Sequence, residues 1–267
     1  MSGIAPADGR SASLRAQLSL TERLFASRED KGMATRIDEG LERVEEGILA
    51  QVSFGDQVAD VRSRYLLVAG GKRVRPVLTL LTAQLGDGVT DDVVTAAQAV
   101  EILHVGSLYH DDVMDEASER RGVPSAQQVW GNSVAILTGD LLFARASKLI
   151  AGIQGSTGIL GQAEVFERLV LGQLHETVGP EPDQDPVDHY LQVLEDKTGA
   201  LIAAAAEWGS SFSNAPEYTR LPLATFGRRI GVAFQLIDDV IDLAPEEADT
   251  GKPVSYTHLT LPTILRV

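Results

Sequence analysis

The chain has 267 residues, of which 44% are hydrophobic, so it is long enough for one large domain or two small ones with a buried core. Its formal charge of −15 argues against a nucleic-acid surface, and any anionic substrate must be received by a local basic cluster or by metal ions. The sequence has no cysteine, which excludes disulfides and thiolate metal sites. It has neither a signal-peptide pattern nor an apolar run long enough to span a membrane, so we expect a cytoplasmic protein.

The order of apolar residues predicts a series of long helices. Residues 1–36 mix small, polar and charged side chains and are expected to be loosely ordered. Apolar residues then recur at helical spacing from Ile37 onward, and further helices are predicted over 58–69, 77–85, 91–114, 133–153, 163–178, 188–208 and 223–243. Short segments rich in glycine and proline separate them, and no stretch of sustained alternation predicts a sheet. We therefore expect an all-α protein of long antiparallel helices.

The last residues, 254–267, differ from the rest of the chain. They are rich in β-branched residues, contain no acidic side chain and follow abruptly on an acidic, helical segment. The string resembles the translation of a transposon-type sequencing adapter. We therefore expect a non-native tail, with native sequence ending near Pro253, and the alternative is a native terminal segment.

Two copies of one acidic pattern carry most of the chemical information, namely Asp111-Asp112-Val113-Met114-Asp115 and Asp238-Asp239-Val240-Ile241-Asp242. On a helix, the first and last Asp of each run lie one turn apart on the same face. Three carboxylates in a small patch repel one another unless a cation lies between them, and Mg²⁺ prefers carboxylate oxygens while keeping positions open for phosphate. Each run follows apolar sequence, unlike the acidic pairs elsewhere that indicate solvated faces. Two such patches facing each other would hold a polyphosphate through bridging metal ions.

Two basic clusters accompany the acidic runs. The first, in the glycine-rich segment 70–76, allows Lys72 and Arg75 to project together, and arginine offers a bidentate fork to phosphate oxygens. The second contains Arg120 and Arg121, just after the first acidic run. Basic pairs of this kind are more often solvated surfaces, but their position beside acidic runs in so acidic a chain favours a binding site.

Other polar residues share faces with the acidic runs. His104 precedes Asp111 by two helical turns and could donate a hydrogen bond to a diphosphate, although a lone histidine on such a helix is usually structural. Lys197 and Thr198 lie in a mostly apolar helix, and Gln235 lies one turn before the second acidic run. Polar groups in these positions suit the wall of an apolar cavity.

Taken together and in this order, these motifs closely resemble those of the trans-isoprenyl diphosphate synthases, also called polyprenyl synthetases, over residues 37–253. The resemblance implies an isoprenoid-synthase bundle around a central cavity, with 37–253 as a catalytic domain that is incomplete at its C-terminus. It implies a prenyltransferase that condenses isopentenyl diphosphate head-to-tail onto an allylic diphosphate by magnesium-assisted ionisation. It also implies a homodimer.

The resemblance assigns roles to individual residues. Three Mg²⁺ ions, held together with the allylic diphosphate, would be bound by Asp111, Asp112, Asp115, Asp238, Asp239 and Asp242. The diphosphates would also contact Arg120 on the allylic side, Lys72, Arg75, His104 and Arg121 on the isopentenyl side, and Lys252 in a loop. The residues near the ionising allylic carbon would be Lys197, Thr198 and Gln235.

The small residues Gly106 and Ser107, one turn before Asp111, indicate the length of the product. In this family, bulky residues there stop elongation early, so we expect an all-trans product longer than C20, a membrane lipid. The alternatives are a short-chain farnesyl or geranylgeranyl diphosphate synthase, a class I terpene cyclase and a non-catalytic partner subunit of a heteromeric synthase. The second Asp run argues against a cyclase, and the presence of both runs argues against the non-catalytic subunit. A purely structural helical bundle would give no reason for two Asp triads.

Overall fold

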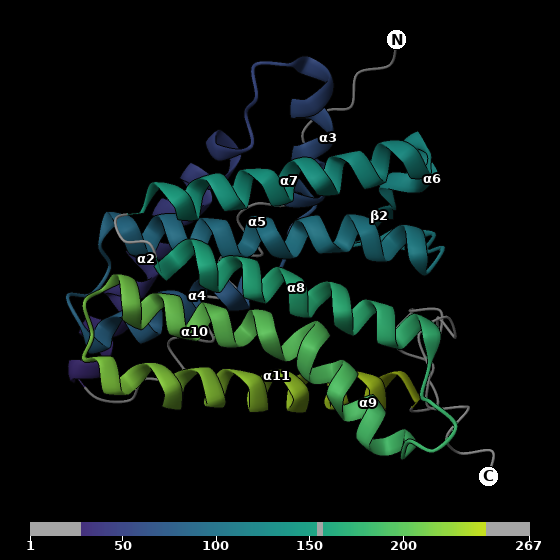
Figure 1. Ribbon diagram of the computed structural model, residues 1–267. Helices are drawn as coiled ribbons and strands as arrows, with labels where there is room; N and C mark the ends of the chain where they lie inside the picture. The colour runs from purple at the N-terminus through teal and green to yellow at the C-terminus, as the bar shows by residue number, and fades with distance from the viewer. Residues whose placement is uncertain (1–27, 154–156, 244–267) are drawn as a thin grey trace.

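Long helices, roughly parallel or antiparallel to one another, make up most of the computed structural model, which describes residues 28–153 and 157–243 (Figure 1). The α-helices are α2 (Arg28–Gln51), α3 (Gln57–Val68), α4 (Val74–Thr82), α5 (Asp91–Met114), α6 (Ala126–Trp130), α7 (Asn132–Gly152), α8 (Thr157–Val178), α9 (Pro186–Leu194), α10 (Ala200–Phe212) and α11 (Arg220–Leu243). The shorter elements are the 3₁₀-helices η1 (Ala83–Leu85) and η3 (Glu217–Thr219), the π-helix η2 (Glu195–Gly199), and the strands β1 (Glu119–Arg120) and β2 (Val123–Pro124). The two strands form a short antiparallel hairpin, and the predicted all-α class is confirmed.

The predicted helix boundaries agree with the structure at some ends and differ at others. α5 occupies the predicted range 91–114. α2 and α8 begin earlier than predicted, at Arg28 and Thr157. Residues 1–27 and the tail 254–267 lie outside the described residues, and so do the predictions that fall on them.

The helix predicted over 188–208 is divided in two by a π-turn. Its first part, α9, begins at Pro186 because the side chain of Asp185 accepts hydrogen bonds from the backbone N–H groups of Val187 and Asp188. The π-helix η2 follows without a break and leads into α10. A single π-turn inside a helix is often found at a functional site, and it leaves no signal in apolar periodicity.

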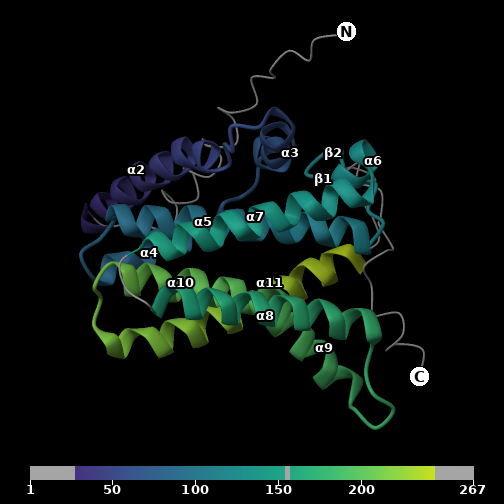
Figure 2. The ribbon, with the colours of Figure 1, turned by 45° about the horizontal axis from the view of Figure 1, so that its top comes forward.

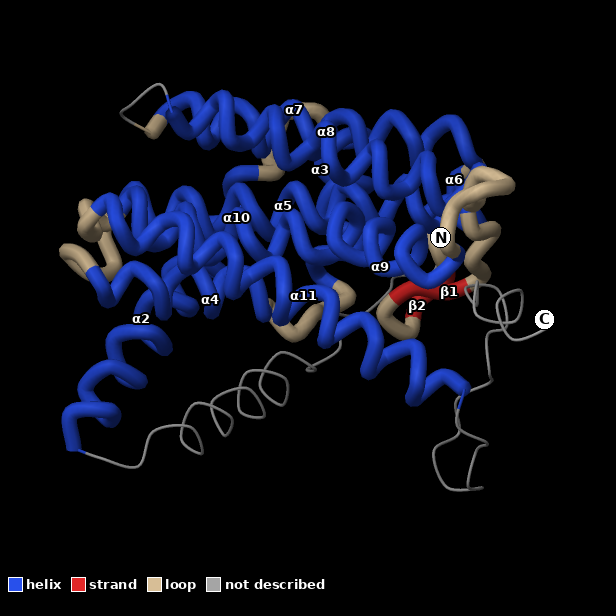
Figure 3. The backbone as a smooth tube through the Cα atoms, turned by 60° about the horizontal axis from the view of Figure 1, so that its bottom comes forward, coloured by secondary structure: helices blue, strands red, loops and turns tan. Residues whose placement is uncertain are grey.

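α5 is the central helix of the bundle and contacts α2, α4, α7 and α10. Figure 2 shows α2 and α3 on one side of the α5–α7 pair, with α8, α10 and α11 on the other. α5, α8 and α11 run in one direction, and α7 and α10 run in the opposite direction (Figure 1). The C-terminal ends of α5, α8 and α11 therefore lie at one end of the bundle, where Figure 3 also shows α9 and the β-hairpin.

Burial around α5 forms the main core. Its fully buried large side chains include Ile102, Leu103, Tyr109, Leu142, Ile150 and Leu201. Tyr109 also satisfies its polar end, because its hydroxyl donates to the carbonyl oxygen of Arg62 and accepts from the backbone N–H of Leu66. A buried phenol normally finds such partners, and these two fix α3 against α5.

Glycines allow α5 and α7 to pack closely. A Cβ atom added at Gly106 of α5 would lie 3.1 Å from the Phe143 ring of α7. One added at Gly139 of α7 would lie 2.4 Å from the His110 ring of α5. Side chains larger than hydrogen would push these two helices apart.

The same constraint applies where α10 crosses α4, and we expect Gly209→Ala to destabilise the fold. A Cβ at this position would lie 2.1 Å from the carbonyl oxygen of Thr79, which belongs to the backbone of a rigid helix. The free energy of unfolding should fall by about 1–3 kcal/mol, measured by urea denaturation. Gly152→Ala is the control because no atom lies within 4 Å of its added Cβ, and it should leave stability unchanged or raise it by up to about 1 kcal/mol. Equal losses in both variants would contradict this account of the packing.

Candidate active site

Both acidic runs lie at the same end of the bundle, because α5 and α11 run in the same direction (Figure 1). Asp111 and Asp112 lie in the last turn of α5, and Asp115 is its C-terminal cap residue. Asp238 and Asp239 are partly buried near the end of α11. The helices thus place at one end of the bundle two runs that are far apart in the sequence.

A network of hydrogen bonds connects α11 with η2 and α9. Gln235 Nε2 donates to Oδ1 of Asp239 at 3.0 Å, and the Thr198 hydroxyl donates to Oε1 of Gln235 at 3.3 Å. The Tyr190 hydroxyl donates to the other carboxylate oxygen of Asp239. Burial and the contact with Asp239 raise the pKa of Tyr190, so the phenol keeps its proton and acts as a donor. Thr198 and Gln235, which were predicted from the sequence, therefore lie in one network with the second acidic run.

Lys197 provides a positive charge between the first acidic run and α8. Its Nζ lies 2.6 Å from Oε2 of Glu176. Burial alone would lower the pKa of Lys197. The carboxylates of Asp111, Glu176 and Asp115 more than offset burial and raise the pKa, so the ammonium stays charged.

The pKa of Asp111 is raised to about 6. Burial is the largest cause, because it disfavours the ionised carboxylate. The charge of Lys197 lowers the pKa, Asp115 raises it, Arg120 lowers it and Glu176 raises it. The cations nearby therefore do not fully offset burial and the neighbouring carboxylates.

Asp112 holds the β-hairpin against α5. It is fully buried, and Arg120 donates through Nε to its Oδ1 at 2.6 Å. Gln127 Nε2 donates to the backbone carbonyl oxygens of Asp112, at 2.7 Å, and Ala117, at 3.0 Å. Arg120, predicted to contact the allylic diphosphate, is thus in an ion pair within the first acidic run.

Glycines on both neighbouring helices fit closely around the π-helix that carries Lys197 and Thr198. A Cβ added at Gly172 of α8 would lie 2.8 Å from the backbone nitrogen of Lys197. One added at Gly231 of α11 would lie 2.7 Å from Cα of Gly199. The backbone of η2 is therefore held between α8 and α11, which fixes where both polar side chains begin.

The predicted isopentenyl residues lie at the same end of the bundle. Arg75, Arg121 and other arginines surround His104, and burial followed by these positive charges holds the pKa of His104 well below its usual range. The imidazole is therefore neutral at pH 7. Lys72 is exposed, and its Nζ lies 5.8 Å from the centre of the Phe234 ring on α11.

Arg73, the third cation of the first basic cluster, is a structural residue. Its exposed fraction is 6%, and it forms ion pairs with Glu45 of α2 and, at 2.9 Å, with Glu101 of α5. It also donates to the backbone carbonyl oxygens of Leu67 and Gly70. These partners occupy its guanidinium and anchor the loop before α4.

The donor chemistry of the site fits Mg²⁺, although within residues 28–153 and 157–243 no three His, Cys, Asp or Glu side chains are grouped to hold a metal. The carboxylates of Asp111, Asp115 and Glu176 lie close enough to interact and are hard oxygen donors of the kind that Mg²⁺ prefers. The side chain of Asp242, in the last turn of α11, and all of Lys252 lie outside the described residues. Their predicted roles remain predictions.

An all-α bundle with acidic runs at one end is the architecture of the isoprenoid synthases, and comparisons with known proteins agree. A decaprenyl diphosphate synthase from Rhodobacter capsulatus superposes with a TM-score of 0.77 at 33% identity, covering 88% of this chain and 74% of that one. A geranylgeranyl pyrophosphate synthase from Corynebacterium glutamicum superposes with a TM-score of 0.73 at 41% identity, covering 86% and 68%. Nonaprenyl diphosphate synthase of Mycobacterium tuberculosis is 43% identical over 224 residues, or 84% of this chain and 67% of the relative.

The sequence profile of the polyprenyl synthetase family matches residues 57–265. The chain belongs to this family, and it spans about two thirds of the length of the relatives above. The resemblance recognised from the motifs is confirmed, and with it the prediction of a prenyltransferase.

Three residues at this end of the bundle were not predicted from the sequence. Glu176 and Tyr190 are single residues on α8 and α9, and no repeated motif distinguishes them. Glu101 did leave a signal, because it is the lone Asp, Glu, Lys or Arg side chain in residues 93–109 of α5, which are mostly apolar. An isolated charge in such a run is either paired or functional, and that rule would have identified it.

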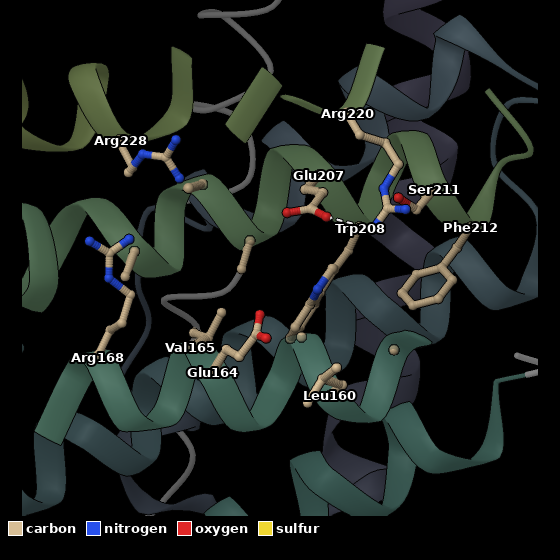
Figure 4. A pocket seen from close by; sticks show the side chains of 15 residues that line it. Leu160, Glu164, Val165, Arg168, Glu207, Trp208, Ser211, Phe212, Arg220 and Arg228 are labelled. Carbon is tan, nitrogen blue, oxygen red and sulfur yellow. Dashed lines mark hydrogen bonds and ion pairs between the residues drawn. The ribbon is translucent and has the colours of Figure 1, made fainter. Parts of the chain in front are cut away.

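A separate cavity of about 270 Å³ lies between α8, α10 and α11 (Figure 4). Trp208 lines it together with arginines that are already in ion pairs, including Arg220, which lies 2.8 Å from Glu207. None of the described residues predicted for the active site lines this cavity.

The raised pKa of Asp111 predicts that Asp111→Asn stabilises the metal-free protein at neutral pH. The carboxyl titrates at its ordinary value of 3.8 in the unfolded chain and near 6 in the folded one, so the folded state binds this proton more tightly. Ionisation therefore lowers stability progressively as the pH rises from about 4 to about 6, and the loss is complete above that range. The variant should be more stable by about 1–3 kcal/mol at pH 7.5, and this gain should shrink as the pH falls toward 4.

Urea denaturation in EDTA at several pH values between 5 and 8 measures the effect. Asp92→Asn, at an exposed position in the first turn of α5, is the control and should show no pH-dependent gain. A variant of Asp111 that is less stable than the unaltered chain at pH 7.5 would contradict the prediction.

Proposed function

We propose that this chain condenses isopentenyl diphosphate head-to-tail onto an allylic diphosphate, giving an all-trans polyprenyl diphosphate longer than C20. One observation carries the proposal: the ends of α5 and α11 bring two Asp runs together at the end of the bundle that also holds a neutral histidine among arginines (Figure 1). Carboxylates and guanidiniums in one site suit a reaction between two diphosphate esters, one held through metal ions and one held directly.

The two acidic runs would hold Mg²⁺, three ions in all, together with the allylic diphosphate. Magnesium bound there would neutralise the diphosphate as it leaves the allylic carbon. Lys197 adds a fixed positive charge next to Asp111 and Glu176. Such preorganised charge stabilises the leaving group without reorganisation during the reaction.

The remaining polar groups would serve the cation and the second substrate. The oxygens of Thr198 and Gln235 have lone pairs that can stabilise positive charge at the allylic carbon. Arg75, Arg121 and neutral His104 would bind the diphosphate of isopentenyl diphosphate and hold its double bond near that carbon. The departing diphosphate would then accept the proton that the new chain loses.

When the chain is incubated with Mg²⁺, farnesyl or geranylgeranyl diphosphate and labelled isopentenyl diphosphate, it should form labelled products longer than the allylic primer. Asp111→Ala removes a metal-binding carboxylate and should lower turnover at least about 100-fold. Asp92→Ala, exposed at the other end of α5, is the matched control and should retain full activity. The products are sized by chromatography, with and without EDTA.

Other products of this assay would support the alternatives. Hydrocarbon products without elongation would support a terpene cyclase, and elongation that requires an added partner protein would support a subunit of a heteromeric synthase. The latter has a precedent in the family, since component 2 of a heptaprenyl diphosphate synthase from Geobacillus stearothermophilus is 33% identical over 238 residues.

The structure separates the two small residues that were predicted to leave the product tunnel open. Gly106 faces α7, where its Cβ position is 3.1 Å from the Phe143 ring, so it belongs to a helix interface. Ser107 is partly exposed, lies one turn before Asp111, and its hydroxyl donates to the His104 carbonyl oxygen of its own helix. The proposed open tunnel therefore depends on Ser107.

Ser107→Phe should shorten the product while keeping the fold. A ring one turn before Asp111 would occupy the path of the growing chain, so the longest product should shift toward C15–C20. Gly106→Phe is the comparison, and it should lower the melting temperature because the ring must enter the α5–α7 interface. Chromatography of the products and thermal denaturation measure the two effects. An unchanged product distribution from folded Ser107→Phe would exclude this part of the proposal.

Relatives alone do not set the length of the product. They include the nonaprenyl diphosphate synthase above and a short chain isoprenyl diphosphate synthase of Methanocaldococcus jannaschii, which is 37% identical over 222 residues.

No helix among the described residues has the length and apolar character needed to cross a membrane. A cytoplasmic homodimer remains a prediction, and exposed apolar side chains of α7 and α8 are compatible with a dimer interface; they include Leu137, Leu160, Val170 and Leu174.

A further inference from the structure

Glu101 is a buried carboxylate that links the two basic clusters of the site. It lies on α5, one turn before His104, and its exposed fraction is 2%. Oε1 of Glu101 lies 2.9 Å from Nη1 of Arg73 and 3.6 Å from Nη2 of Arg121. Arg73 belongs to the loop before α4, and Arg121 lies between the strands of the β-hairpin, so one carboxylate contacts both segments.

The guanidiniums of Arg73 and Arg121 both pack against Gly71. A Cβ added at Gly71 would lie 2.9 Å from Nη1 of Arg73 and 3.0 Å from Cζ of Arg121. Two guanidiniums this close repel each other unless an anion lies between them. Glu101 supplies that anion from the protein itself, before any substrate is bound.

The arginines around Glu101 are engaged to different degrees. Arg73 is fully engaged by protein groups, as described above. Arg121 donates through Nη1 to the Leu66 carbonyl oxygen at 2.8 Å and has a looser contact with Glu101. Nε of Arg75 is buried and has no hydrogen-bond partner among the described residues. Arg121 and Arg75 therefore have donors to offer a diphosphate.

The charge of Glu101 also bears on the ionisation of these groups. Burial lowers the pKa of Arg75 to about 10 and lowers that of Arg121 as well, and in both cases the negative charge of Glu101 is the main opposing influence. A buried guanidinium without that charge would be costlier to keep in place.

We propose that Glu101 is a positioning residue of the isopentenyl diphosphate site: as an internal counter-ion it holds Arg73 and Arg121 together, so that Arg121 and Arg75 present their donors to the diphosphate. This inference rests on the proposed function, since it assumes that the site takes isopentenyl diphosphate. Glu101 does not touch the reacting atoms. Its effect is on the geometry of the arginines.

Glu101→Gln keeps the shape of the side chain and removes its charge. The KM for isopentenyl diphosphate should rise about tenfold or more, with the KM for the allylic diphosphate changed less than about twofold. Calorimetric titration with isopentenyl diphosphate alone should show a similar rise in Kd, and this readout needs no turnover. Glu101→Asp keeps the charge but shortens its reach, so it should give a smaller rise, and it serves as the second variant if Glu101→Gln does not fold.

Glu45→Gln is the matched control, because the ion pair that Glu45 forms among the described residues is with Arg73 and not with Arg121. It should lower the melting temperature by a similar amount and leave the Kd for isopentenyl diphosphate within about twofold of the original. A merely structural role of Glu101 would lower the melting temperature without raising this Kd more than Glu45→Gln does. That result, or tighter binding by Glu101→Gln, would overturn the inference.

The unaltered chain distinguishes the two proposals. If it turns over both substrates and Glu101→Gln binds isopentenyl diphosphate normally, the inference is wrong and the proposed function stands. If it binds isopentenyl diphosphate without turnover and Glu101→Gln weakens that binding, the inference stands and the proposed reaction is wrong. If it neither binds nor reacts, the pocket does not exist and both are wrong.

Discussion

Repulsion between carboxylates at one end of the bundle is the constraint on which the rest of the site depends. α5 and α11 bring two Asp runs to this end, and α8 adds Glu176. The protein holds these groups with separate donors: Arg120 for Asp112, Tyr190 and Gln235 for Asp239. These donors fix carboxylates without removing their charge, so the site remains strongly negative. The site therefore favours the binding of cations from solution.

Close packing at glycines makes this arrangement rigid. η2 is held between α8 and α11 at Gly172 and Gly231, and α5 meets α7 at Gly106. A site in which like charges repel would relax by moving its backbone apart, unless the helices had no freedom to shift. The glycines bring the helices into close contact, so the helices cannot shift relative to one another. Asp111 therefore stays buried beside Asp115 and Glu176, and burial first, then these two carboxylates, raise its pKa.

The sequence predicted those features that depend on local pattern. Apolar periodicity predicted the all-α class, and α5 was placed at its observed bounds. The repeated Asp motif led to the family, because the spacing of the Asp residues within each five-residue run can be read directly from the sequence. Periodicity could not show the π-turn at η2, because a single wider turn leaves the apolar pattern on either side almost intact. It also could not show which of two adjacent small residues faces a neighbouring helix, as Gly106 does and Ser107 does not.

Long-range pairing explains why the basic residues were harder to interpret than the acidic ones. Lys72, Arg73 and Arg75 look equivalent within one short loop, yet Arg73 is engaged by carboxylates from α2 and α5, and Lys72 lies over an aromatic ring of α11. Which cation remains available to a ligand depends on partners far away in the sequence. Glu101 is the partner that decides this for the loop and for the hairpin together, because its one carboxylate meets guanidiniums from both. A basic cluster can therefore bind an anion only through N–H donors that the buried acids around it leave available. Here Arg75 and Arg121 have such donors.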